Sequence, residues 1–387
     1  MKSYNHLFEK VMDYDNIDRA IMQASKHKRE RPEVKRVLDN KDRYIKKLQE
    51  LLNNQTLYFV THEGVKINDG IQHKRRCIIQ PHFVFDQIIH HCVIQAMQDL
   101  LNRGMYEFSC GSVPDRGANR GKRYIEKYIR EHKNSSEIKY IAKMDIHHFF
   151  ESVSPELLKA RFKKYIHDDR MNWLLGKIVD AGNVIIDGEM RHIGLPIGYY
   201  TSQWFANWLL QDLDHFIKEQ LRAKCYVRYM DDIVIFDSSK RKLHRDIESI
   251  KNFLAAYKLQ LKGNYKVFKF DYINKEGKHT GSPLDFMGFQ FYRDRTILRK
   301  SIMIKAGRKA RKISRTPHLS WYEATQMLSY NGWFKHTDTY KTFEKHIKPY
   351  ACIKLCKKMV RRHSIKLDRR KKNANSLQNS TEQQKTS

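Results

Sequence analysis

The stretch YVRYMDDIVIF, Tyr226–Phe236, places two adjacent aspartates, Asp231 and Asp232, inside an otherwise strongly apolar β-type segment. Burying even one carboxylate without a partner costs several kcal/mol, so the pair needs a compensating cation or a turn that reaches water. Apolar runs on both sides of the aspartates predict a β-hairpin whose turn carries them. This stretch therefore predicts a buried hairpin with a charged tip.

A third carboxylate is expected beside the hairpin, because side chains alternate along a strand and Asp231 and Asp232 cannot both face the same way. The best candidate is Asp145, in KMDIHHFF, since it also ends a β segment in the middle of the chain. Three clustered carboxylates facing a phosphate-bearing substrate would bind Mg²⁺, which prefers oxygen ligands. Two such ions, with Mn²⁺ as an alternative, lie about 3.5–4 Å apart in two-metal phosphoryl-transfer sites. The sequence therefore permits two-metal nucleotidyl transfer.

The composition points to a folded protein with a polyanionic partner. The chain has 387 residues, of which 41% are apolar and 12% aromatic, enough for a sizeable core. Its 74 lysine and arginine residues exceed its 43 aspartate and glutamate residues by 31. Nucleic acid is therefore the leading partner, ahead of a membrane surface. No uncharged apolar run could span a bilayer and MKSYNHLFEK lacks signal-peptide features, so we expect a cytoplasmic protein without a membrane partner.

The six cysteines do not predict a structural metal site. They lack the paired CxxC spacing of zinc sites. Cys352, Cys356 and His363 could together ligate a metal, but they lie on a lysine-rich helical stretch and no fourth ligand is evident. We therefore expect ordinary reduced thiols.

Hydrophobic periodicity separates helical from strand-like parts in the first third of the chain. The first 57 residues have helical periodicity and predict two helices joined near Pro32. From Tyr58 to Ile79 the pattern changes to short β-like pieces, which we expect Gly64 and Gly70 to break.

Further along, the pattern predicts alternating strands and helices and then a basic, mostly helical end. Ser154 is a predicted N-cap, and Pro155 a predicted first helical residue. The stretch PLDFMGFQFYRDRTILRK predicts a hairpin, the run KKMVRRHSIKLDRRKK predicts nucleic-acid backbone contacts, and the polar end NANSLQNSTEQQKTS predicts disorder. One helix is predicted where Trp204 and Trp208 are expected to serve the core rather than to stack on bases, and its apolar residues at helical spacing are Trp204, Phe205, Trp208, Leu209, Leu213, Phe216 and Ile217.

The order of these motifs resembles that of the reverse transcriptases. Tyr-Met-Asp-Asp lies between apolar strands and follows MDIHHFF and GLPIGYYTSQWFAN, and the resemblance runs from about Asn16 to Tyr350. It implies an α+β fold of the right-hand polymerase type, with fingers, a reverse-transcriptase palm and a helical thumb. The expected divisions are an N-terminal helical extension over 1–57, fingers and palm over 58–295, the thumb over 296–365 and a basic to polar tail over 366–387.

The same resemblance implies roles for individual residues. Asp145 and Asp231 would be the principal metal ligands, and Asp232 the accessory carboxylate. Phe150, five residues beyond Asp145, would be the aromatic gate that clashes with a ribose 2′-hydroxyl and favours deoxynucleotides. Arg76 would be the main contact of a basic fingers cluster with the triphosphate. The implied nucleotide-binding residues are Lys74, Arg75, Arg76, Phe150, Pro196, Ile197, Gly198 and Gln203, and the implied primer grip is Phe286, Met287 and Gly288.

One loop departs from the common family pattern. Many reverse transcriptases carry Pro-Gln-Gly beside the nucleotide, whereas this chain has Pro-Ile-Gly at 196–198 and Thr-Ser-Gln at 201–203. This form resembles the enzymes of diversity-generating retroelements and of related bacterial antiviral-defence systems, and it argues against group II intron and retron enzymes. We therefore expect a bacterial protein in one of these two settings, between which one chain does not decide.

The implied activity is that of an RNA-directed DNA polymerase, which makes cDNA from dNTPs on an RNA template by elongating a DNA or RNA primer. A dedicated structured noncoding RNA is the expected template, and an accessory protein is a further candidate partner. A function from another class stays open, that of a noncatalytic RNA-binding subunit with a retired polymerase fold. The presence of all three carboxylates and of Phe150 favours catalysis.

Overall fold

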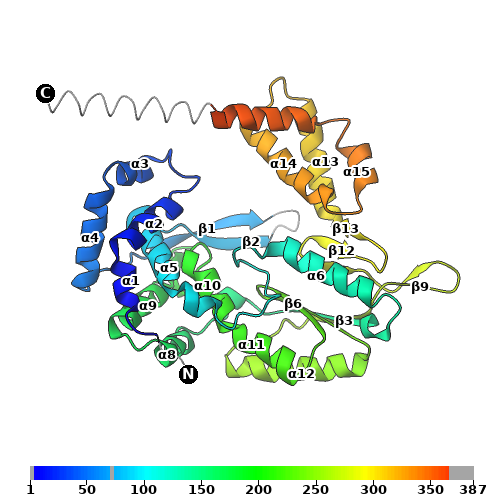
Figure 1. The fold of residues 1–387 in the computed structure, drawn as a ribbon, viewed down its shortest axis with the longest axis horizontal. Helices are drawn as coiled ribbons and strands as arrows, with labels where there is room; N and C mark the ends of the chain where they lie inside the picture. Colours follow the sequence, from blue (N-terminus) through cyan, green and yellow to red (C-terminus); the bar gives the residue numbers. More distant parts are fainter. Residues whose placement is uncertain (1–3, 70–73, 366–387) are drawn as a thin grey trace. The chain divides into compact units, whose positions relative to one another are not determined.

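The computed structural model describes residues 4–69 and 74–365. The chain forms two compact units, Met1–Lys269 and Phe270–Ser387. The fold class is α+β, as predicted, since helices and mainly antiparallel sheets build each unit (Figure 1). These two units are defined by packing alone. The functional divisions expected at 1–57, 58–295 and 296–365 therefore remain predictions. The expected tail over 366–387 lies outside the described residues.

The first unit contains most of the regular elements. Its helices are α1 (Leu7–Met12), α2 (Tyr14–Ala24), α3 (Pro32–Asp39), α4 (Lys41–Asn53), η1 (Phe83–Gln87), α5 (Ile88–Asn102), α6 (Gly117–Glu131), η2 (Ser136–Ile138), α7 (Phe149–Ser152), α8 (Pro155–Tyr165), α9 (Asp169–Asp180), α10 (Tyr200–Leu209), α11 (Gln211–His215), η3 (Phe216–Gln220) and α12 (Lys240–Ala256). Its strands are β1 (His62–Asp69), β2 (Lys74–Ile79), β3 (Tyr140–Asp145), β4 (Asn183–Ile186), β5 (Glu189–His192), β6 (Cys225–Tyr229), β7 (Asp232–Asp237) and β8 (Lys266–Lys269).

A four-stranded antiparallel sheet, in the order β6-β7-β3-β8, lies at the centre of the first unit. β6 and β7 form the hairpin predicted from YVRYMDDIVIF, with Tyr229 opposite Asp232 at its closed end. Four successive residues of each strand are buried, so both faces of the hairpin are covered. α12 packs against β3, β7 and β8, and α6 packs against β6 (Figure 1). This two-sided burial explains why the strands read as continuous apolar runs.

A second four-stranded sheet has the order β2-β1-β4-β5, with β1 antiparallel to β2 and parallel to β4. The prediction that Gly64 breaks a strand is wrong, because β1 runs through it. A Cβ atom at Gly64 would lie 2.2 Å from the Cys77 Sγ atom on β2. Glycine at this position therefore permits the close approach of the two strands. The other expected break, at Gly70, lies outside the described residues.

Four helices occupy the described residues 4–57, where the sequence predicted two. The Asp13 carboxylate accepts a hydrogen bond of 3.0 Å from the Asn16 N–H and so caps α2 directly after α1. α3 begins at Pro32, as expected for a helix start, and Asn40 alone separates α3 from α4. Because such single-residue breaks hardly disturb the apolar spacing, periodicity alone merged the helices.

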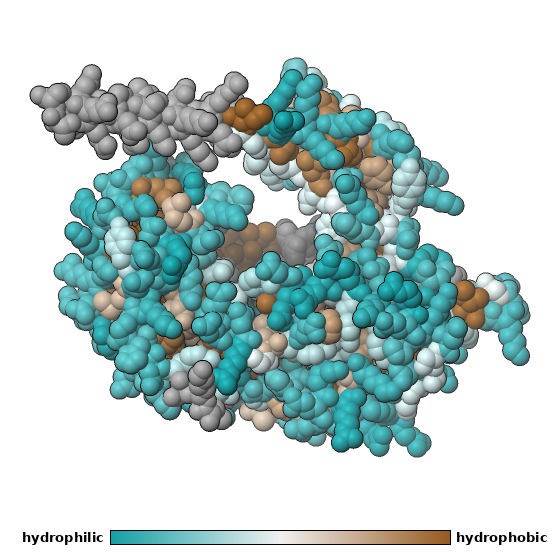
Figure 2. Space-filling model, in the orientation of Figure 1, coloured by the Kyte–Doolittle hydropathy of each residue, from teal (hydrophilic) through white to brown (hydrophobic). Residues whose placement is uncertain are grey.

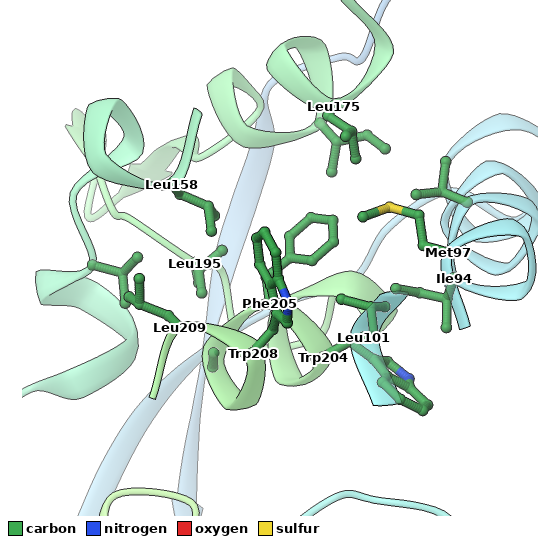
Figure 3. Close-up of a cluster of buried hydrophobic side chains, with 14 of the residues drawn as sticks. Ile94, Met97, Leu101, Leu158, Leu175, Leu195, Trp204, Phe205, Trp208 and Leu209 are labelled. Carbon is green, nitrogen blue, oxygen red and sulfur yellow. The ribbon is translucent and has the colours of Figure 1, made fainter. Parts of the chain in front are cut away.

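The predicted apolar stripe from Trp204 to Ile217 belongs to the core but is not one helix. It is divided among α10, α11 and the π-helical turn η3. Phe205 and Trp208 of α10 point into a cluster with Leu158 of α8 and Leu175 of α9 (Figure 3). The expectation that Trp204 and Trp208 serve packing is confirmed, since these residues are 4% and 2% exposed.

The second unit contains short strands followed by basic helices. A three-stranded antiparallel meander, β11-β12-β13, replaces the hairpin predicted there. The Tyr292 N–H donates to the Arg295 carbonyl at 2.8 Å, and this turn adds the third strand. The helical end is confirmed, and a further helix covers 353–365. The elements are β9 (Tyr272–Ile273), β10 (His279–Thr280), β11 (Leu284–Phe286), β12 (Phe289–Phe291), β13 (Thr296–Leu298), α13 (Lys300–Ser314), α14 (Trp321–Lys335) and α15 (Tyr340–His346).

The surface and the thiols agree with the composition. Hydrophilic side chains predominate over α6 and α12 on the face shown in Figure 2. All six cysteines are free thiols that form no disulfide. No helix within 4–69 and 74–365 has the length and apolar character needed to cross a bilayer.

Candidate active site

The tip of the β6–β7 hairpin carries the two adjacent aspartates. Tyr229 is the last residue of β6, Met230 and Asp231 form the turn, and Asp232 is the first residue of β7. Met230 has a φ angle of 56°, in the left-handed region that residues with a side chain rarely adopt. This conformation sets the direction in which the chain leaves the turn, and with it the direction of Asp231.

The neighbouring strand β3 supplies the third carboxylate, as predicted. Asp145, its last residue, is the register partner of Asp232 on β7. Directly opposed side chains of antiparallel strands project from the same face of a sheet. The Ile146 N–H donates to the Asp231 carbonyl at 3.3 Å, which ties the turn to the end of β3. The structure therefore brings Asp145, Asp231 and Asp232 together at one end of the central sheet.

The three carboxylates repel one another. Burial, followed by the charge of Asp145, raises the pKa of Asp231 above its ordinary value. The same two causes raise the pKa of Asp232 to about 6. Lys262 and Arg76 act in the opposite direction on Asp231, since their positive charges lower its pKa. Burial and mutual repulsion thus disfavour the ionised form of Asp231 and Asp232, and a bound cation would offset both effects.

Lys262 is a site residue that the sequence analysis missed. Its ammonium group pairs with the Asp145 carboxylate, and its N–H donates to the Asp145 carbonyl at 2.8 Å. The His147 N–H donates to the Gln260 carbonyl at 2.7 Å, so the segment 260–262 continues the pairing beyond the end of β3. The local stretch LQLKGNYK contains no signal for this role, because Lys262 reaches Asp145 only through the fold.

The donor set suits a magnesium ion, although no three-ligand site is preformed. Across the described ranges, no group of three or more His, Cys, Asp or Glu side chains has the spacing of a metal site. The Asp145 Oδ1 atom is nevertheless buried without a hydrogen bond of good geometry, although the Lys262 ammonium group pairs with it. Carboxylate oxygens are the donors that Mg²⁺ prefers, and Mg²⁺ usually completes its shell with substrate phosphates and water. An incomplete protein shell is therefore compatible with this ion.

A cavity of about 350 Å³ lies beside the second sheet and brings two predicted nucleotide contacts together. Arg76 on β2 and Ile197 line it, together with Glu151 and Leu195. The Leu195 N–H donates to the carbonyl of Phe150 at 2.8 Å, which places the predicted gate next to this wall. Arg76, which lines this cavity, also acts through its charge to lower the pKa of Asp231.

The loop at 196–198 is fixed from both sides. The Ile79 N–H at the end of β2 donates to the Ile197 carbonyl at 2.8 Å. Gly198 has a φ angle of 120°, and a Cβ atom there would lie 2.0 Å from the Ile79 carbonyl oxygen. The Pro196 carbonyl accepts a hydrogen bond of 2.7 Å from Ser202 Oγ. Strand β2 therefore positions this loop through its backbone.

The remaining predicted contacts have different surroundings. Lys74 and Arg75 lie on β2 next to Arg76. Gln203 is exposed on α10. The predicted primer grip, Phe286, Met287 and Gly288, belongs to the second unit, where it forms the end of β11 and the turn to β12. Met287 and Gly288 have φ angles of 51° and 88° in this turn.

A buried antiparallel sheet that ends in three carboxylates is typical of the palm of nucleic-acid polymerases. Residues 71–291 match the family described as reverse transcriptase (RNA-dependent DNA polymerase). The chain therefore belongs to the reverse transcriptase family.

Individual relatives match shorter parts of the chain. Protein YkfC of Escherichia coli strain K12 is 23% identical over 137 residues, 35% of this chain and 35% of that protein. The retron Ec73 reverse transcriptase of Escherichia coli is 28% identical over 145 residues, 35% of this chain and 44% of that protein. The chain thus spans less than half the length of these curated relatives. A structure of apo telomerase from Candida tropicalis, truncated from the C-terminal domain, has a TM-score of 0.45 at 14% identity and covers 62% of this chain and 55% of that one.

Proposed function

We propose that this chain is an RNA-directed DNA polymerase that elongates a DNA or RNA primer with dNTPs on an RNA template. The observation that carries the proposal is the meeting of Asp145 with Asp231 and Asp232 at one end of the palm sheet, in a chain of the reverse transcriptase family. The burial and mutual repulsion of these carboxylates support a role in cation binding, because a bound cation would stabilise their ionised form.

Asp145, Asp231 and Asp232 would hold two Mg²⁺ ions, or Mn²⁺ in their place. When bound, such ions activate the primer hydroxyl and neutralise the leaving oxygen of an in-line phosphoryl transfer. Arg76 would hold the triphosphate, since its guanidinium is always charged and matches phosphate geometry. Phe150 would exclude the ribose 2′-hydroxyl by steric contact. Lys262 would balance the charge of Asp145 in the metal-free protein.

The expected nucleic-acid partners follow from the charge of the chain, whose basic residues exceed its acidic residues by 31. A dedicated structured noncoding RNA is the proposed template, with an accessory protein as a further partner. The Pro-Ile-Gly loop at 196–198 supports a diversity-generating retroelement or an antiviral-defence system as the setting. The similarity to a retron enzyme, over 35% of the chain, lends this narrower assignment no support, because retrons are a different setting.

Primer extension on a defined RNA template, with Mg²⁺ and labelled dNTPs, tests the proposal. Asp231→Asn should lower the extension rate by about 10³-fold while RNA affinity stays unchanged. Asp237→Asn is the matched control, because Asp237 is the last residue of β7, opposite Tyr140 and at the far end of that strand from the turn. A wild-type protein that binds RNA but extends no primer with either metal would instead support a noncatalytic RNA-binding subunit.

A further inference from the structure

A fully buried ion pair lies directly behind the catalytic hairpin. Arg228 on β6 and Asp214 on α11 both have side chains that are 0% exposed. The Arg228 guanidinium donates to both Asp214 carboxylate oxygens, Nε to Oδ1 at 2.7 Å and Nη2 to Oδ2 at 2.6 Å. Tyr226, on the same strand, donates its hydroxyl to Asp214 Oδ1 at 2.5 Å. The ion pair therefore anchors β6 to the helix behind it.

The remaining nitrogen of the guanidinium reaches the turn itself. Arg228 Nη1 donates to the Met230 carbonyl at 3.0 Å and to Asn207 Oδ1 at 2.9 Å. Asn207 in turn donates from Nδ2 to the Gly111 carbonyl at 2.8 Å. A Cβ atom at Gly111 would lie 2.6 Å from the Met230 backbone nitrogen. The turn is thus enclosed by Arg228, Asn207 and the backbone at Gly111.

The Arg228 backbone is fixed in the same way. Its N–H donates to the Phe108 carbonyl at 3.1 Å, and its carbonyl accepts from the Cys110 N–H at 2.8 Å. Residues 108–110 therefore run along the free edge of β6 and lead directly to Gly111. Backbone and side chain together leave Arg228 little freedom to move relative to the turn.

The left-handed Met230 conformation requires such support. A residue with a side chain is strained there, and the strain persists only when its surroundings determine the conformation. Hydrogen bonds from a charged donor are about twice as strong as neutral ones, so the Arg228 bond to the Met230 carbonyl is a suitable restraint. Asp231 and Asp232 follow Met230 directly, and a change in its φ angle would turn both carboxylates away from Asp145.

We propose that Arg228 is a positioning residue, which acts with Asn207 to hold the Met230 turn and so sets Asp231 and Asp232 against Asp145. This role rests on the proposed polymerase function. Stability alone does not explain the arrangement, because buried ion pairs often contribute little net stability compared with apolar packing. The contact of Nη1 with the turn, in addition to the pair with Asp214, is what a positioning role requires.

Arg228→Lys removes the restraint and Asn207→Leu loosens it, and both keep the buried charges balanced. Arg228→Lys retains a cation for Asp214, but one ammonium group cannot reproduce the fork that also reaches Asn207 and the Met230 carbonyl. Asn207→Leu leaves the Arg228–Asp214 pair intact and removes the link to Gly111. Gln211→Met is the matched control, because Gln211 is an amide only 5% exposed that donates to the Leu101 carbonyl at 2.9 Å.

The test measures Mn²⁺ affinity by electron paramagnetic resonance, kcat for primer extension, primer–template Kd and Tm. Arg228→Lys and Asn207→Leu should weaken Mn²⁺ binding and lower kcat, each by about 10–100-fold, with little change in primer–template Kd. Gln211→Met should change Tm alone. Unchanged Mn²⁺ affinity in the folded fraction of both test variants would overturn the positioning role.

The metal measurement separates this inference from the proposed function. A wild type that binds Mn²⁺ at the aspartates but extends no primer refutes the polymerase proposal, while weaker Mn²⁺ binding by the variants still supports positioning. If Arg228→Lys does not fold, Asn207→Leu decides the outcome. A wild type that neither extends primers nor binds Mn²⁺ overturns both.

Discussion

Asp145, the last residue of β3, lies opposite Asp232, the first residue of β7, in antiparallel register. Burial and this neighbour raise the pKa of Asp232 to about 6. The pairing therefore concentrates negative charge where the proposed nucleotidyl transfer would need a cation. It also makes the metal-free active site a source of instability, with measurable consequences.

Replacing Asp232 by Asn should stabilise the protein in EDTA. Because the folded-state pKa, about 6, exceeds the ordinary value of 3.8, the folded protein binds this proton more tightly than the unfolded chain. The ionised carboxylate thus costs stability above pH 6, and the cost vanishes below the ordinary pKa. We expect Asp232→Asn to raise unfolding free energy at about pH 7.5 by on the order of 1–3 kcal/mol. Denaturant titrations at several pH values check this, and an equal or larger gain at about pH 4 would contradict it.

Gly198→Ala should disturb the nucleotide loop. The new Cβ atom would lie 2.0 Å from the Ile79 carbonyl oxygen, and φ is 120°, so the loop must move away from β2. We expect KM for dNTPs to rise about tenfold or more. Gly176→Ala serves as control, because nothing lies within 4 Å of its Cβ position, and should stabilise α9 by about 0.5–1 kcal/mol. An unchanged KM for dNTPs in Gly198→Ala would mean that the loop at 196–198 does not take part in nucleotide binding.

Ile197→Gln should improve fidelity. The Ile197 carbonyl bond to the Ile79 N–H does not depend on the side chain, so the loop should keep its position. A glutamine amide could add one orienting hydrogen bond near the nucleotide, about 1–1.5 kcal/mol or roughly tenfold in selectivity. Error rates on a defined RNA template measure this. Ile193→Gln, in the same cavity, controls for added polarity. Equal error rates in the wild type, Ile197→Gln and Ile193→Gln would mean that the side chain at position 197 affects packing but not accuracy.

Phe150→Ala should relax sugar selection. Loss of the ring would leave space for a 2′-hydroxyl, so incorporation of ribonucleotides relative to deoxynucleotides should rise, by about tenfold or more. The ratio is insensitive to loss of folded protein, which affects both substrates equally. Phe149→Leu alters the neighbouring ring, which is 2% exposed in the core, and should leave the ratio unchanged. A ratio unaffected by Phe150→Ala would place the gate elsewhere.

Deleting residues 366–387 should weaken the salt dependence of template binding. Each phosphate contact contributes a slope of about −0.7 on single strands, so loss of the basic run at 366–372 should flatten the log–log plot. The cut spares the helix 353–365, whose His363 stacks on Trp321 with ring centroids 4.7 Å apart. Removing only 373–387 is the control, since that segment lacks the run. Identical slopes in both truncated proteins would mean that the basic run does not contact the phosphate backbone of the template.

The sequence by itself determined the features that depend on neighbouring residues. Apolar runs around Asp231 and Asp232 predicted the hairpin, and the end of another β segment predicted the place of Asp145. Ser154 and Pro155 predicted the start of α8, where the Leu157 N–H donates to Ser154 Oγ at 3.4 Å. These predictions held because hairpin turns, caps and strand ends are decided by local chemistry.

Tertiary structure alone decided how the site is held. The Arg228–Asp214 pair, the Lys262–Asp145 pair and the Ile79–Ile197 backbone bond join residues from different elements. No spacing in the chain encodes such contacts, since each depends on how the strands and helices pack. Burial also strengthens the Arg228–Asp214 pair, whose side chains are 0% exposed, because ion pairing grows stronger as water is removed. The residues proposed to carry out the chemistry could therefore be predicted from the sequence. The contacts that hold them in place and the charges that act on them could be identified only from the fold.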